Sequence, residues 1–80
     1  MKENLEEKFV VCIDNSGFPV SLELFKIYRV VPDIDAESCN DLRVIDESGE
    51  DYLYPESRFI PIKVPQKVKR AIQNLVTSAY

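Results

Sequence analysis

A short segment in the middle of the chain restricts the possible folds more than any other. Residues 46–55 read DESGEDYLYP, and residues 59–62 read FIPI. A turn at Gly49, a strand with two tyrosines, a break at Pro55 and a second short strand follow one another here. Short strands joined by tight turns predict a small barrel-like sheet. No sequence motif for catalysis, metal binding or phosphate binding overlaps these strands.

The N-terminal part of the chain predicts one further strand and an irregular loop. Residues 8–14, KFVVCID, are rich in β-branched and aromatic side chains and predict the first strand. Pro19 has no backbone N–H and is disfavoured in a central strand, so we expect a loop over residues 18–24. We expect Leu22 and Leu24 to fill one end of the core from this loop.

The next segment shows the alternation of a half-buried strand. In residues 26–31, KIYRVV, Tyr28 and Val30 share one face, which we expect to point inward. Residues 32–41 have no usable period and predict a long acidic connection. Three more strands are predicted at residues 42–46, 51–54 and 59–62, the last at a sheet edge because it contains Pro61.

Hydrophobic spacing after Pro65 changes from a period of two to a period of about 3.6. The apolar residues then fall on one stripe of a helix: Val68, Ala71, Ile72, Leu75, Val76 and Ala79. We therefore expect an amphipathic C-terminal helix over residues 65–80, packed on the sheet or on a partner.

Length and composition predict one small folded domain. The 80 residues, of which 45% are hydrophobic, suffice for a single compact core. We expect a flexible N-terminus over residues 1–7, a barrel over residues 8–64 and the helix over residues 65–80. The opening segment is charged, and no apolar run approaches the roughly 20 residues of a membrane helix, so we expect a cytoplasmic protein without membrane contact. Cys12 and Cys39 are then expected to be reduced, with a redox role left open.

Several kinds of chemistry are disfavoured by what the chain lacks. It contains no His, no glycine-flanked nucleophile and no phosphate-binding loop, so we expect a protein that is not an enzyme and needs no cofactor. Asp33, Asp35 and Glu37 alternate like the carboxylates of a calcium loop. The glycine and the distal glutamate of such a loop are missing, so we expect no metal site there.

Charge is distributed unevenly along the chain. Residues 33–56 contain nine acidic residues and one basic residue, Arg43. Residues 58–70 contain no acid and five bases: Arg58, Lys63, Lys67, Lys69 and Arg70. The two stretches either neutralise each other within the fold or present opposite patches to partners. Nucleic-acid or anionic-ligand binding through the five bases is an alternative hypothesis, although the net charge of −4 disfavours general nucleic-acid binding.

A group of short segments resembles small, largely uncharacterised bacterial proteins with an SH3-like β-barrel. The segments are KIYRV at 26–30, VID at 44–46, SGE at 48–50, YLYP at 52–55 and FIPI at 59–62. The resemblance covers roughly residues 8–62 and implies a five-stranded SH3-like barrel, in a mainly β chain with a C-terminal helix. Those proteins carry a Gly before the Lys of the Tyr strand, whereas Phe25 stands there in this chain. The resemblance implies a fold and no catalytic residue.

Three hypotheses about function follow. The first is a non-catalytic protein-interaction module that binds its partner through an aromatic face of Tyr28, Tyr52, Tyr54 and Phe59. Alternatively these aromatic side chains belong to the core, depending on strand register. The second is anion binding through the basic stretch 58–70. The third is a structural homodimer formed through the helix stripe of Val68, Ile72, Leu75 and Val76. No motif in the sequence assigns the function directly.

Overall fold

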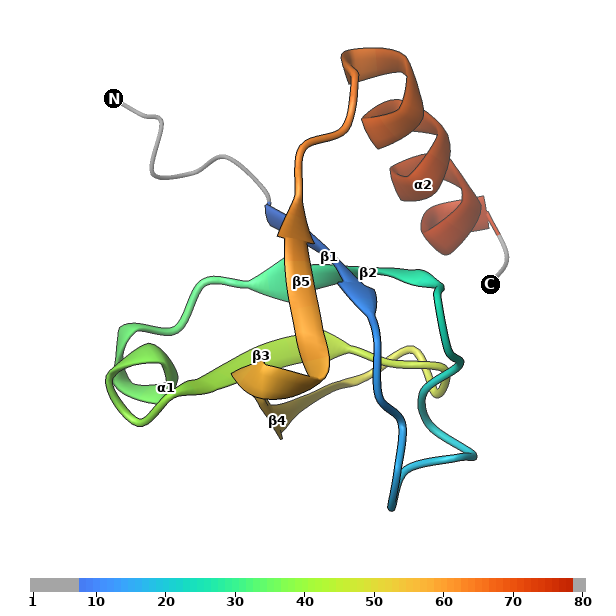
Figure 1. The fold of residues 1–80 in the computed structure, drawn as a ribbon. Helices are drawn as coiled ribbons and strands as arrows, with labels where there is room; N and C mark the ends of the chain where they lie inside the picture. Colours follow the sequence, from blue (N-terminus) through green and yellow to red (C-terminus); the bar gives the residue numbers. More distant parts are fainter. Residues whose placement is uncertain (1–7, 79–80) are drawn as a thin grey trace.

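In a computed structural model, the chain forms one five-stranded antiparallel sheet followed by a C-terminal helix (Figure 1). The structure describes residues 8–78, with side chains to residue 72, so the predicted flexible segment 1–7 lies outside the described residues. The strands are β1 (Lys8–Cys12), β2 (Ile27–Val31), β3 (Asp41–Ile45), β4 (Asp51–Pro55) and β5 (Phe59–Ile62). The predicted mainly β class with a C-terminal helix is confirmed.

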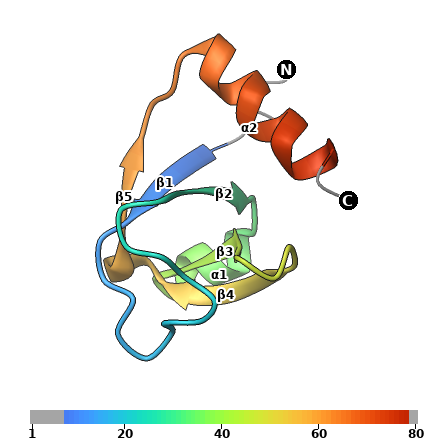
Figure 2. The ribbon, with the colours of Figure 1, turned by 90° about the vertical axis from the view of Figure 1, so that its right-hand side faces the viewer.

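The order of strands in the sheet is β4-β3-β2-β1-β5. The first strand therefore lies between β2 and β5, and Val10 is paired with Tyr28 on one side and with Pro61 on the other. A 3-10 helix, η2 (Glu56–Arg58), carries the chain from β4 at one edge to β5 at the other. The sheet is strongly bent (Figure 2), but β4 and β5 are not paired, so it is not a closed barrel.

The core lies on the concave face of this bent sheet. It is formed by Val10, Cys12, Leu22, Tyr28, Val30, Val44, Tyr54 and Phe59. The inward orientation predicted for Tyr28 and Val30 is confirmed, and Leu22 is fully buried as expected. The prediction for Leu24 is wrong, because its side chain is 47% exposed. Leu24 lies in a turn, where the two-residue alternation of a strand does not apply.

A bulge at Phe25 sets the start of β2. The backbone N–H of Phe25 donates to Cys12 O (2.6 Å), and Cys12 N–H donates to Lys26 O (3.0 Å), so two residues oppose one across the strand pair. Phe25 has a φ of 64°. This left-handed conformation is the one that a glycine adopts in such a bulge. A bulky residue therefore occupies a bulge position that favours glycine.

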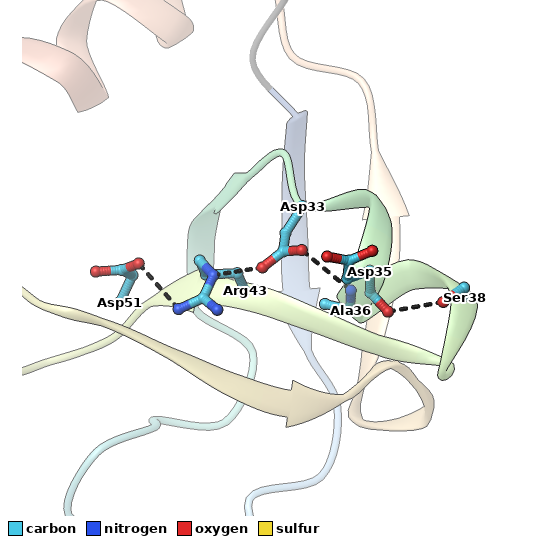
Figure 3. Close-up of polar contacts among 6 residues, drawn as sticks. All are labelled: Asp33, Asp35, Ala36, Ser38, Arg43 and Asp51. Atoms are coloured by element: carbon cyan, nitrogen blue, oxygen red, sulfur yellow. Dashed lines mark hydrogen bonds and ion pairs between the residues drawn. The ribbon is translucent and has the colours of Figure 1, made fainter.

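The acidic connection between β2 and β3 contains a short helix, α1 (Ile34–Ser38), which the sequence did not predict (Figure 3). Asp33 caps it, since its Oδ1 accepts a hydrogen bond from Ala36 N–H (3.1 Å). Only Ala36 of this helix is buried. Five residues are too few for a hydrophobic period to emerge, which explains why the segment reads as a loop.

The predicted C-terminal helix is α2 (Gln66–Ser78). Pro65 stands directly before it, and its carbonyl accepts the first helical hydrogen bond, from Lys69 N–H (2.9 Å). Both views place α2 beyond the end of the sheet where β1 begins and β5 ends (Figures 1 and 2). Within residues 8–78, no helix combines the length and the apolarity needed to cross a membrane.

Candidate functional site

Three of the four residues of the predicted aromatic face lie in the core. Tyr28, Tyr54 and Phe59 are each 4–5% exposed, and only Tyr52 is open to solvent, at 51%. The ring of Tyr54 packs edge-on against Phe18 and Phe59. These side chains are inward because they share the concave face of the sheet, so they form no common surface for a partner. The predicted partner-binding aromatic face is therefore wrong for Tyr28, Tyr54 and Phe59. These three residues take the alternative role, that of core residues.

A buried polar network explains how Tyr54 is accommodated. Tyr54 Oη donates to Asp46 Oδ2 (2.6 Å) and is hydrogen-bonded to Ser21 Oγ (2.9 Å). The other carboxylate oxygen of Asp46 accepts from Ser48 N–H (2.9 Å) and Ser48 Oγ (2.6 Å). Burial alone would raise the pKa of Asp46, but these hydrogen bonds outweigh it and hold the pKa below its ordinary value. The network fixes the loop before β2 to the turn before β4.

A second network holds the hydroxyl of Tyr28. Tyr28 Oη donates to Glu47 Oε2 (2.5 Å) and accepts from Glu23 N–H (2.7 Å). Lys26 Nζ lies 2.7 Å from the same oxygen of Glu47. Burial, together with the neighbouring Glu47 carboxylate, raises the pKa of Tyr28 well above its ordinary value. Tyr28 therefore stays protonated at neutral pH and serves as a structural hydrogen-bond donor.

The acidic stretch is engaged in local structure (Figure 3). Arg43 Nε lies 2.7 Å from Asp33 Oδ2, and Arg43 Nη1 lies 3.3 Å from Asp51 Oδ2. The hydrogen bond from Arg43, with that from Ala36 N–H, lowers the pKa of Asp33. Asp33 therefore acts as a helix cap and ion-pair partner. The carboxylates that alternate like a calcium loop in the sequence are placed on and beside α1.

The five predicted anion-binding residues do not form one patch. Arg58 precedes β5, pairs with Asp14 Oδ1 (3.0 Å) and places its guanidinium carbon 5.3 Å from the ring centroid of Phe18. The length of β5 separates it from the other four bases, which follow that strand. Among the described residues, no acid of the stretch 33–56 forms an ion pair with a base of the stretch 58–70. Direct neutralisation of one stretch by the other, the first of the two sequence-based alternatives, is therefore not seen in this part of the chain.

A groove opens at the end of the concave face, where β1 begins and β5 ends. Its volume is about 610 Å³, within the range of ligand pockets. The apolar lining includes Val10, Val30, Leu42, Pro61, Ile62 and Val64. Val10 and Val30 also belong to the core, and Leu42 packs against it. The groove thus borders the core at one end of the open sheet, with Val10 and Val30 buried at its base and with Leu42, Ile62 and Val64 half-buried along it.

Three lysines line the same groove. Lys8 comes from the start of β1, Lys63 from the segment after β5, and Lys69 from the first turn of α2. Lys8 and Lys63 are exposed and Lys69 is half-buried. No acidic side chain of the described residues lies within ion-pair distance of any of them. The site therefore combines an apolar floor with positive charge that the described part of the chain leaves uncompensated.

Sequence reasoning identified Lys63 and Lys69 as binding residues but missed Lys8 and the groove. A usable signal was present, because Lys8, Val10 and Cys12 alternate on one face of the first strand. A lysine on the inward face of a strand marks the point where the core ends. Lys67 and Arg70 of the predicted set are exposed on α2 and do not line the groove.

The predicted helix stripe is partly exposed where its side chains are described. Val68 is 39% exposed and Ile72 is half-buried, whereas the side chains of Leu75 and Val76 lie outside the described residues.

Cys12 is a buried free thiol, and Cys39, which follows α1, is an exposed free thiol.

Comparisons of this chain with protein-family models, with curated proteins and with solved structures find no match. Function must therefore be inferred from the groove itself.

Proposed function

We propose that this protein is a non-catalytic protein-interaction module built on a small SH3-like barrel. Five short antiparallel strands, a strong bend and a 3-10 turn between the two edge strands support this type of fold. The resemblance of roughly residues 8–62 to small bacterial proteins with such a barrel supports it as well. Two free cysteines agree with a reducing cytoplasm.

One observation carries the proposal, namely the groove of about 610 Å³ with an apolar floor and three lysines along it. Apolar grooves with a few polar groups are typical of sites that bind peptides or small molecules. Neither of the two hydrogen-bonded tyrosine networks opens into it, since Tyr28 and Tyr54 are not among its lining residues. The described residues of the groove therefore offer contact area and charge and include no arranged acid–base pair.

A direct test is to select binders of the purified protein from a displayed library of random short peptides. Amide spectra of the labelled protein, recorded with the selected peptides, then locate the binding site. We expect shifts at Lys8, Val10, Lys63 and Val64. If no peptide is enriched, or if all the shifts lie away from these residues, the proposal is wrong.

Homodimer formation through α2 is a second candidate, because Val68 on its apolar stripe is 39% exposed. Sedimentation equilibrium at low and high salt tests it. A dimer at both salts that becomes a folded monomer on Ile72→Glu would assign the stripe to self-association. An unfolded Ile72→Glu protein would show instead that the stripe belongs to the protein's own core.

A further inference from the structure

We infer that the groove binds an acidic segment of another protein, in which apolar side chains occupy the floor and carboxylates meet Lys8, Lys63 and Lys69. This inference rests on the proposed function and adds the chemical class of the partner. It depends on the contrast between the groove and the rest of the molecule.

The contrast is one of charge. The whole chain carries a net charge of −4, yet the described residues that line the groove include three lysines and no acidic residue. The lysines come from β1, from the segment after β5 and from α2, so three separate parts of the chain bring positive charge to one place. Complementary charge across an interface selects partners and speeds their association.

Three other cations of the sheet and its loops are already paired with carboxylates. Lys26 pairs with Glu47, Arg43 with Asp33 and Asp51, and Arg58 with Asp14. The described residues supply no such carboxylate to Lys8, Lys63 or Lys69. A partner segment with carboxylates would supply the counter-charges and, with its apolar side chains, would cover the half-buried Leu42, Ile62 and Val64.

The lining also distinguishes an acidic peptide from a nucleic acid. Aromatic side chains on which bases stack are characteristic of single-strand binding sites. Phe9 is the one aromatic residue among the described lining residues, and at 2% exposed it offers no surface for stacking, while the other apolar lining residues are aliphatic. Aliphatic side chains suit a polypeptide partner better than nucleobases.

The experiment uses peptides selected on the full-length protein. We expect them to contain more Asp, Glu and apolar residues than the unselected library. Fluorescence anisotropy then compares each peptide with its Glu→Gln and Asp→Asn counterpart on the wild-type protein and on variants. Lys63→Glu and Lys69→Glu should each weaken binding by about tenfold, because each exchanges an attraction for a repulsion. Added salt should weaken binding through the same contacts.

Lys67→Glu is the matched control. It makes the same change of charge on the same helix at an exposed residue that does not line the groove, so we expect less than about a twofold effect. Circular dichroism of all three variants verifies that α2 and the sheet are retained.

The outcomes separate the two proposals. If groove-binding peptides show no excess of acidic residues and bind the Lys63→Glu protein equally well, the partner class is wrong while the interaction module stands. If no peptide binds in the groove, both are wrong. If a single-stranded DNA oligonucleotide displaces the peptides and binds more tightly than they do, the site is for nucleic acid and the inference is overturned.

Discussion

Phe25 offers the sharpest test of the link between sequence and fold, because a bulky residue occupies a backbone conformation suited to glycine. Its φ is 64°, and its side chain is 74% exposed. The left-handed conformation costs an L-residue roughly 1–2 kcal/mol, whereas glycine adopts it freely. A side chain this exposed recovers little of that cost by burial. Replacing Phe25 should therefore reveal the strain.

The magnitude follows from three contributions. Since about a quarter of a phenylalanine is covered, its removal loses roughly 0.4–0.8 kcal/mol of burial. Phe25→Ala loses that burial and keeps the strain. Phe25→Gly loses the same burial and relieves the strain, but it gives the unfolded chain entropy worth about 0.4–1 kcal/mol relative to alanine. We expect the Gly variant to be more stable than the Ala variant by about 0.5–1 kcal/mol and to lie close to the wild type.

Urea unfolding followed by circular dichroism measures the difference, with equal slopes confirming that the unfolded states match. Leu24 is the matched control, because it is also a partly exposed residue of this turn but has no positive φ. There the order should be reversed, with Leu24→Ala more stable than Leu24→Gly. If Phe25→Ala is as stable as Phe25→Gly, the turn is not strained and the reasoning fails.

Four further predictions concern stability. Gly49→Ala should cost about 0.5–1 kcal/mol in urea unfolding, because Gly49 has a φ of 87° and a Cβ there would meet no atom within 4 Å, so the backbone strain is offset only in part by the lower entropy of the unfolded alanine chain; an unchanged midpoint would contradict this. Tyr54→Phe should cost about 1–3 kcal/mol by removing the donor to the buried carboxylate of Asp46, whereas Tyr52→Phe, which loses only an exposed hydrogen bond, should change little. Because the pKa of Asp46 is lowered in the folded protein, this carboxylate stabilises the fold fully at any pH above its pKa in the unfolded chain, about 3.9, and the effect is lost as the pH falls through the lower pKa of the folded state. The melting temperature should therefore decrease when the pH is lowered below about 4, and it should decrease less steeply in Asp46→Asn. Asp33→Ala should lower the melting temperature more than Asp33→Asn, because asparagine keeps the helix cap and loses only the ion pair; equal melting temperatures would show that the cap contributes nothing.

Local patterns were sufficient to predict most of the secondary structure. The segment FIPI was placed correctly at residues 59–62, because a short apolar run with proline suits only an edge strand. The alternation in residues 26–31 identified the inward face of β2, and the change of period after Pro65 identified α2. The edge strand, the inward face of β2 and the position of α2 each depend on residues that are close together in the sequence, so the sequence alone predicts them.

The site depended on distances that sequence patterns do not contain. Tyr52 and Tyr54 share one face of β4, yet the first is 51% exposed and the second 4%. Alternation shows which residues share a face, but it does not show how far along that face the core extends. The same limit hid the groove, because its lysines are brought together by the pairing of β1 with β5 and by the position of α2.

The central position of β1 also has a consequence for how the chain folds. Of the five described strands, β1 is made first and can pair with β2 soon after synthesis, but its other edge is filled only by β5, which is made after the other four. Contacts between such distant segments slow folding, because the intervening chain must be closed before the pairing contributes stability. On the ribosome, the edge of β1 therefore stays open at least until residue 62 has emerged. Until β5 docks, β1 is the edge most open to pairing with other chains.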